Sequence, residues 1–251
     1  MLTSHRKQAI LAALKRDGQV IAKDLSESFA VSEDTIRRDL RELAAEGLLQ
    51  RVHGGALPAS PAIGTFEQRQ QISTDGKSAI ARKAASMVRP GQVVIIDGGT
   101  TCVQMARHLP LTLKATVVTH SPSVALELIE HPDIEVIMIG GRLFKHSIVA
   151  IGAAAIEAIG HIRADTYFMG VTGIHPSAGL STGDLEEAYI KRALMARAAE
   201  TVVLASAEKI NAASPYVVAE AAAVSSMVID AGAIESSMTP FVQLGIGIVR
   251  A

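Results

Sequence analysis

The feature that most constrains this sequence is the alternation, from Lys77 onward, of short apolar runs with helical stretches. The runs are rich in β-branched residues and cover 93–97, 115–119, 135–139, 166–169, 201–205 and 227–230. Continuous apolar strands separated by helices are typical of a mostly parallel sheet that helices cover on both faces. We therefore predict an α/β domain over residues 77–251.

The first 57 residues follow a different pattern, which predicts a small winged helix-turn-helix domain. Helical periodicity and turn residues indicate three helices, at about 4–16, 25–29 and 33–46. Gly47 ends the third helix, and the alternating residues 48–57 around Gly54 predict a β-hairpin wing. Residues 58–76 contain prolines, glycines and scattered polar residues, a composition that predicts a linker.

The third predicted helix has an apolar face and a cationic face. Ile36, Leu40 and Leu43 lie within about 40° of one another on the helix and form a seam to be buried. A helix that follows a tight turn and exposes cations is typical of a recognition helix in the major groove of DNA. The predicted DNA-contacting residues are Ser32, Thr35, Arg37, Arg38, Arg41, Arg51 and His53. In the alternative interpretation, these arginines only solvate the helix and pair with Asp34, Glu42 or Glu46.

Composition narrows the classes of function. The formal net charge is −1, so contact with DNA must come from local clustering of cations. The absence of tryptophan disfavours a protein that stacks single-stranded bases on aromatic rings. A single cysteine, Cys102, allows neither an internal disulfide nor a zinc cluster. No apolar run is long enough to be a secretory or spanning segment. We expect a cytoplasmic protein, nucleoid-associated when bound to its operator, with no cofactor, no metal and no membrane partner.

Polar and glycine-rich residues follow the predicted strands, where ligands bind in parallel α/β sheets. Residues 97–101, Asp-Gly-Gly-Thr-Thr, lead into a helix and offer N–H groups and hydroxyls that suit a phosphate. An ordinary tight turn is the alternative for this loop. The next three strands are followed by further candidate ligand-binding residues, namely Thr119, His120, Ser121, Gly141, Arg142, Lys145 and Gly173.

Three residues after the fourth strand share one face of a helix. Asp184, Glu187 and Lys191 have i, i+3 and i+7 spacing, which favours either a ligand-binding set or a surface salt-bridge face. His120 has a similar alternative, since it could be a structural imidazole bonded to a nearby carbonyl. Cys102 has no paired base in the sequence pattern, so we expect it to pack at the start of its helix.

The run 31–56, VSEDTIRRDLRELAAEGLLQRVHGGA, resembles the signature of the DeoR family of bacterial regulators. Residues that fall where that family's pattern expects them are Arg6, Ile10, Thr35, Arg37, Arg38 and Asp39. Residues 77–209 are similar to the family's sensor domain, itself similar to sugar-phosphate isomerases and CoA transferases. The matching motifs are the 97–101 loop, residues 118–121, residues 140–143 and the 184–192 helix.

This resemblance implies an effector site made of the candidates above together with Lys209, which follows a polar stretch after the strand ending near Ala205. Two positions depart from the family's pattern. Ser206 stands where many members carry Asp, and His120 stands where Asn is frequent. Both departures suggest a variant ligand.

The resemblance further implies a repressor of a carbohydrate or sugar-acid catabolic operon, controlled by a phosphorylated sugar-like metabolite. One winged helix contacts few bases, so we expect a homodimer or homotetramer on double-stranded operator DNA. An alternative is a sugar-phosphate isomerase-like enzyme with a DNA-binding head, in which Asp97, Asp184, Glu187 and Lys191 move protons. A third interpretation treats the C-terminal half as a dimerisation module without a ligand.

Overall fold

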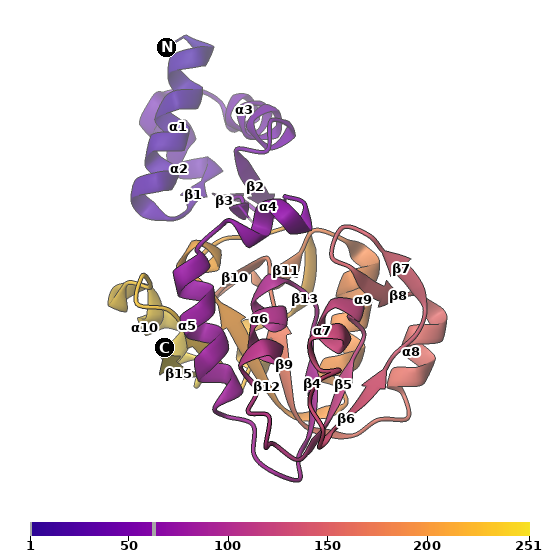
Figure 1. Cartoon of the computed structure of the whole chain (residues 1–251). Coiled ribbons are helices and arrows are strands. Elements are labelled where there is room, and N and C mark those ends of the chain that lie inside the picture. Colours follow the sequence, from indigo (N-terminus) through magenta and orange to yellow (C-terminus); the bar gives the residue numbers. More distant parts are fainter. Residues whose placement is uncertain (1, 62–63) are drawn as a thin grey trace.

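The computed structural model describes residues 2–61 and 64–251, which form a small N-terminal head and a larger α/β domain, called the sensor domain here after the resemblance noted above (Figure 1). The head contains α1 (Thr3–Asp17), α2 (Ala22–Phe29) and α3 (Glu33–Ala45). Its antiparallel sheet has the order β1-β3-β2, with β1 (Val20–Ile21), β2 (Leu49–Val52) and β3 (Gly55–Pro58). The winged helix-turn-helix predicted from the sequence is therefore present.

The head is held together by one apolar core and one buried ion pair. Ile36, Leu40 and Leu43 of α3 are buried in this core, as their helical spacing predicts. Arg6 of α1 donates to Asp39 of α3 through Nε at 2.5 Å and Nη2 at 3.1 Å. Both side chains are buried, so this bidentate pair fixes α1 against α3.

Glycine at the tip of the wing has a steric reason. Gly54 has φ of +78°, a conformation that favours glycine. A Cβ atom on Gly55 would lie 1.9 Å from the carbonyl oxygen of Val20. The Gly-Gly pair therefore allows the hairpin to turn and β3 to pair with β1.

The sensor domain is built on a seven-stranded parallel sheet with the order β15-β14-β12-β9-β4-β5-β6. The strands are β4 (Val93–Ile96), β5 (Ala115–Thr119), β6 (Ile134–Met138), β9 (Ala164–Gly170), β12 (Ala198–Ala205), β14 (Ser226–Ile229) and β15 (Gly247–Arg250). The chain runs outward from β4 to β6, then returns to β9 on the other side of β4. The boundary between β4 and β9 is thus the switch point at which α/β sheets bind ligands.

Helices cover the two faces of this sheet and enclose separate apolar cores. One core takes residues from α5 (Thr74–Ala85), α6 (Thr100–His108) and α7 (Pro122–Glu127). The other takes residues from α8 (Ala153–Ile159), α9 (Leu185–Met195) and α10 (Glu235–Gln243). The predicted α/β class is confirmed. Across the described residues, no helix combines the length and apolar character that a membrane span needs.

Two small antiparallel elements were not expected from the sequence. β7 (Arg142–Phe144) pairs with β8 (Val149–Ile151), and β10 (Gly173–His175) pairs with β11 (Gly179–Thr182), which also pairs with β13 (Tyr216–Ala219). The sheet also gains β15, which the sequence pattern did not indicate. These strands have three or four residues each, too few to show a clear period.

The segment interpreted as a linker, residues 58–76, is partly ordered against the sensor domain. Ala59 forms a parallel bridge with Ala213, and the Ser60 hydroxyl donates to the carbonyl of Thr172 at 2.5 Å. Further on, helix α4 (Phe66–Gln70) begins at a capping box that involves Thr65 and Gln68. Local composition predicted a loop because Ala59 and Ser60 are held by residues more than 100 positions further along the chain.

Candidate functional site

The cationic face of α3 is the candidate DNA-binding surface. Ser32 caps the helix by accepting from the N–H of Thr35 at 3.2 Å. Arg38 and Arg41 are exposed, and no salt bridge involves either within the described part of the chain. The two guanidinium groups are therefore available for phosphates or base edges.

Among the described residues, the alternative of internal pairing holds for Arg37 and not for Arg38 or Arg41. Arg37 pairs with Glu33 at 2.7 Å and lies 3.8 Å from Asp34. Glu42 and Glu46, the other acids considered, are instead engaged by Lys7 of α1. The wing residues predicted to contact DNA, Arg51 and His53, are exposed on β2 and on the turn that follows it.

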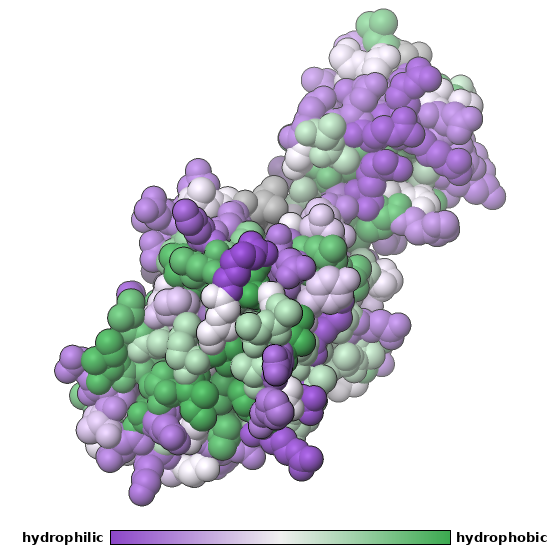
Figure 2. All heavy atoms as spheres, turned by 90° about the vertical axis from the view of Figure 1, so that its right-hand side faces the viewer, coloured by the Kyte–Doolittle hydropathy of each residue, from purple (hydrophilic) through white to green (hydrophobic). Residues whose placement is uncertain are grey.

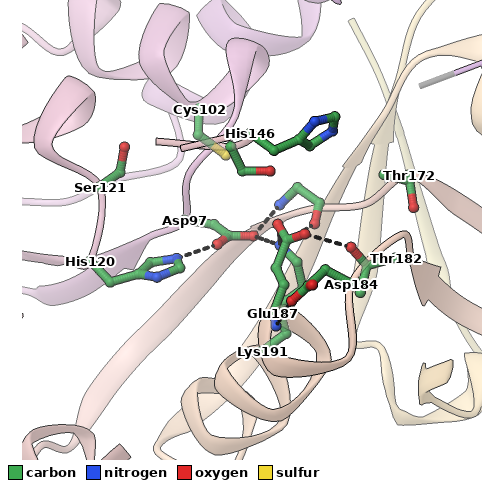
Figure 3. A network of polar contacts seen from close by, with 12 residues as sticks. Asp97, Cys102, His120, Ser121, His146, Thr172, Thr182, Asp184, Glu187 and Lys191 are labelled. Carbon is green, nitrogen blue, oxygen red and sulfur yellow. Dashed lines mark hydrogen bonds and ion pairs between the residues drawn. The ribbon is translucent and has the colours of Figure 1, made fainter. Parts of the chain in front are cut away.

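The candidate effector site lies at the switch point, where Asp97 directly follows β4. Its side chain is fully buried. One carboxylate oxygen contacts Nε2 of His120 at 2.8 Å. The other accepts from Nζ of Lys191 at 2.5 Å and from the N–H of Gly170 at 2.9 Å. Figure 3 shows Asp97 between His120 and the polar residues of α9. Asp97 therefore ties together the ends of β4, β5 and β9 with α9.

Opposite charges keep this network ionised. Burial alone would raise the pKa of Asp97, but Lys191 and His120 outweigh it and hold that pKa well below its usual range. Burial likewise would lower the pKa of Lys191, whereas Asp97 and Glu187 raise it. Glu187 lies 3.7 Å from Lys191 and accepts from the hydroxyl of Thr182 at 2.7 Å. The Glu187–Lys191 pair is thus part of the site and not a surface salt bridge.

A cleft opens directly beside this network. The predicted residues that line it are Gly98, Gly99, Thr100, Thr101, Glu187, Lys191 and Lys209. The sequence interpretation missed other lining residues, chiefly Arg69, Lys77, Thr172, Thr182 and Glu208. Arg69 comes from residues 58–76, which were interpreted as a linker, and Lys77 is the first residue of the predicted α/β domain. Their cationic character was the one available signal, but nothing local indicated that they fold back onto the 97–101 loop.

The cleft carries an excess of positive charge. Asp97 neutralises Lys191, which leaves the cations of Arg69, Lys77 and Lys209 facing the carboxylates of Glu187 and Glu208. Burial, reinforced by Lys209, lowers the pKa of Lys77 to about 8. Burial also lowers the pKa of Lys209 and that of Arg69. A bound anion would relieve the cost of these poorly solvated cations.

At the cleft, two buried polar atoms have no hydrogen-bond partner in the part of the chain that the structure describes. The hydroxyl of Thr101, in the first turn of α6, has no hydrogen-bond partner among the described residues, and neither does Nε of Arg69. Both side chains are at least nine-tenths buried. The first turn of α6 adds N–H groups that a helix cannot satisfy internally. This set of donors is suited to phosphate oxygens.

Several predicted effector residues form structural hydrogen bonds instead of lining the cleft. Thr119 accepts from the N–H of Ser121, and the Ser121 hydroxyl caps α7. Asp184 caps α9 by accepting from the N–H of Glu187. His120 supports Asp97 from behind and contacts the carbonyl of Ala150 at 3.0 Å. These residues shape the edge of the sheet without lining the cleft.

The remaining candidates lie away from the cleft. Gly141, Arg142 and Lys145 are exposed around the β7–β8 hairpin, and Gly173 is buried in β10. Cys102 packs in the core at the start of α6, as expected. Burial and the neighbouring Asp97 raise the pKa of its thiol to about 12, which excludes a thiolate nucleophile at neutral pH.

Comparison with known proteins gives one family match to the N-terminal head and another to the α/β domain. Residues 6–61 match the DeoR-like helix-turn-helix domain, and residues 72–231 match the DeoR C terminal sensor domain. The chain belongs to the DeoR family of transcriptional regulators. It is 35% identical over 214 residues to the HTH-type transcriptional regulator GlpR of Haloferax volcanii, covering 84% of this chain and 83% of that one. It is 36% identical over 196 residues to the glycerol-3-phosphate regulon repressor of Escherichia coli, covering 78% of each.

Among solved structures, ribose 5-phosphate isomerase A from Methanocaldococcus jannaschii is a distant match, with a TM-score of 0.41, 18% identity and 54% of each chain covered. The curated relatives are named as regulators and repressors. They confirm the prediction of a DeoR-family regulator and contradict the alternative of an isomerase-like enzyme.

Proposed function

We propose that this DeoR-family repressor works in the cytoplasm on a carbohydrate or sugar-acid catabolic operon and releases its operator when a phosphorylated sugar-like metabolite binds the sensor cleft. In its working form it is a homodimer or homotetramer. The observation that carries the effector class is the buried excess of cations around the first turn of α6.

A phosphate group matches this cleft in charge and in hydrogen bonding. It brings acceptor oxygens to the Thr101 hydroxyl and to the open N–H groups of α6. Its negative charge balances Lys77 and Lys209, which otherwise repel each other. The carboxylates of Glu187 and Glu208 line the same cleft and are acceptors for sugar hydroxyls. One ligand with an anionic end and a hydroxylated end satisfies both groups.

The linker gives the effector a route to the head. Thr172 lines the cleft, and its carbonyl accepts a hydrogen bond from the hydroxyl of Ser60. Ser60 lies two residues after the end of β3, the second strand of the wing. Arg69 of α4 also lines the cleft and donates to the carbonyl of His146 at 2.9 Å. A ligand that moves either residue therefore moves the segment that carries the head, and operator and effector affinities become reciprocally coupled.

The test is operator binding in the presence of phosphosugars. Sequence-selective binding to the DNA next to its own gene should be measured at fixed salt, and a panel of sugar phosphates and sugar-acid phosphates should then be added. We expect one of them to weaken operator binding, with the dephosphorylated sugar as an inactive control. Operator binding that no phosphorylated compound changes would contradict the effector class but not the DNA-binding role.

Arg38→Ala is expected to weaken operator binding by roughly 1–3 kcal/mol, about 5- to 150-fold, because Arg38 is exposed on α3 and forms no salt bridge with any residue that the structure describes. Arg89→Ala removes an exposed arginine of the sensor domain and is the matched control. Fluorescence anisotropy with the operator and with a scrambled duplex separates base reading from phosphate contact. Full operator affinity in the Arg38 variant would exclude a role in recognition.

Thr100→Glu is expected to reduce effector affinity at least about tenfold, since it places a carboxylate at the start of α6 where the phosphate would lie. Operator binding without effector should be unchanged. Thr100→Ser keeps the hydroxyl and serves as the control. Thermal shift with the active phosphosugar gives the affinity, and an unaltered shift in the glutamate variant would rule out the α6 phosphate position.

A further inference from the structure

The sensor sheet ends at an unprotected apolar edge. Strand β6 is the last strand beyond β5, and its sequence, Ile-Glu-Val-Ile-Met, contains none of the lysine, arginine or proline residues that commonly protect edge strands. Large exposed side chains surround it, with relative exposures of 66% for Leu126, 67% for Ile129, 41% for Ile137, 41% for Met138 and 48% for Leu143. We call these five residues and β6 the β6 edge.

Figure 2 looks onto the side of the molecule to which this edge belongs and shows apolar side chains gathered over a broad area of the sensor domain. Residues of α7, of the turn that follows it and of β6, among them Leu126, Ile129 and Met138, line one shallow apolar groove. Exposed apolar patches of this kind on a folded domain mark contact surfaces.

The backbone of β6 is in the register that self-pairing needs. The N–H of Ile139 donates to the carbonyl of Thr119 in β5. Backbone groups of alternate residues point to opposite sides of a strand, so those of Ile134, Val136 and Met138 point away from β5. Two antiparallel β6 strands related by a two-fold axis at Val136 would pair Ile134 of one copy with Met138 of the other.

This register is also compatible with the charges. The only charged side chain in β6, Glu135, would lie opposite Ile137 of the second strand and not opposite another carboxylate. The apolar side chains of α7 would meet their own counterparts across the axis. A surface that complements itself is the requirement for an isologous dimer contact.

We propose that the β6 edge binds the β6 edge of a second copy of this chain, which joins two seven-stranded sheets into one continuous sheet across a two-fold axis. The proposal rests on the proposed function only in taking the regulator to be a homo-oligomer. It adds the surface, the strand register and the symmetry of the contact.

Engineered cysteines test the register in the full-length protein, whose own Cys102 is buried. Val136→Cys places two thiols opposite each other at a Cα separation of about 5.5 Å, within disulfide range. Ile137→Cys is the matched control, because its thiol faces Glu135 of the second copy. Mild oxidation is expected to give a covalent dimer at least about tenfold faster for Val136→Cys. Equal rates, or a faster reaction for Ile137→Cys, would overturn the register.

The mass of the protein in solution tests the surface. Sedimentation velocity should give at least a dimer for the natural chain and a halved mass, or a dissociation constant at least about tenfold higher, for Met138→Asp. Ile234→Asp alters a residue that is 69% exposed just before α10 and should not change the mass. An unchanged mass for Met138→Asp would overturn the proposed surface while leaving the regulator an oligomer. A monomeric natural chain would overturn both the β6 contact and the proposed homo-oligomer. Operator binding is measured separately by fluorescence anisotropy, so the DNA-binding role is tested independently.

Discussion

Asp97→Ala is expected to lower the free energy of unfolding of the sensor domain by about 3–5 kcal/mol, the usual cost of removing one member of a buried ion pair. Asp97 is fully buried and accepts from Lys191 and Gly170 while it contacts His120. Its removal takes away the carboxylate that Lys191 contacts directly and leaves the buried ammonium with the more distant Glu187, at 3.7 Å. The large effect comes from this poorly compensated cation more than from the lost hydrogen bonds.

The measurement is chemical denaturation of the full-length chain. Asp133→Ala removes an exposed carboxylate and should change stability by less than about 0.5 kcal/mol. The double variant Asp97→Ala with Lys191→Met removes both charges and should recover part of the loss. A loss below about 1 kcal/mol for Asp97→Ala alone would contradict the buried network.

The same network sets a dependence on pH. The pKa of Asp97 is lowered in the folded chain, so its stabilisation is complete above the ordinary carboxyl pKa of about 4 and is lost as pH falls toward the lowered value. The natural chain should therefore lose more stability than the Asp97→Ala variant when the pH is lowered from about 5 to about 3. Parallel curves for the two proteins would show that the carboxylate is not held ionised.

Asp39→Ala is expected to destabilise the head by about 3–5 kcal/mol, because it removes the buried carboxylate that accepts two hydrogen bonds from the guanidinium of Arg6 between α1 and α3. Amide hydrogen exchange in α3 reports this local opening without interference from the sensor domain. Operator binding should weaken in parallel, since α3 loses its fixed position on α1.

Glu46→Ala is the control for Asp39→Ala. It removes an exposed partner of Lys7 at 3.4 Å and should cost less than about 1 kcal/mol. Equal rates of amide hydrogen exchange in α3 for the two variants would show that the Arg6–Asp39 pair stabilises the head no more than an exposed ion pair does.

Local periodicity was enough to predict the elements with a strong repeating pattern. The apolar seam of Ile36, Leu40 and Leu43 fixed both the buried face of α3 and the exposed positions of its arginines. Strand β5 was predicted residue by residue, because a fully buried parallel strand is a continuous apolar run. The exposed edge strand β6 was placed one residue late.

The effector cleft was only half predictable. Glycines and hydroxyls after a strand were enough to predict the 97–101 loop. Arg69 reaches the cleft by tertiary folding of the predicted linker, and Lys77 reaches it from α5, which does not follow a strand of the sheet. Asp184 and Ser121 show the converse. Their positions after strands suggested ligand contact, but both side chains cap helices. The sequence could not separate the two roles, because Asp and Ser are common both at helix N-caps and in ligand-binding loops.

The Arg6–Asp39 pair was not foreseen either, although both residues had been placed in the family pattern. They are 33 residues apart in sequence, and no local spacing links them.

The segment that follows the wing is anchored to the sensor domain. Strand β3 continues through Ala59, which is bridged to Ala213, into Ser60, which is bonded to Thr172. In the proposed dimer, this anchoring would let the sensor domains set the distance between the two recognition helices. A change of half a helical turn between the operator half-sites would then be a mismatch that the segment after the wing could not accommodate by bending.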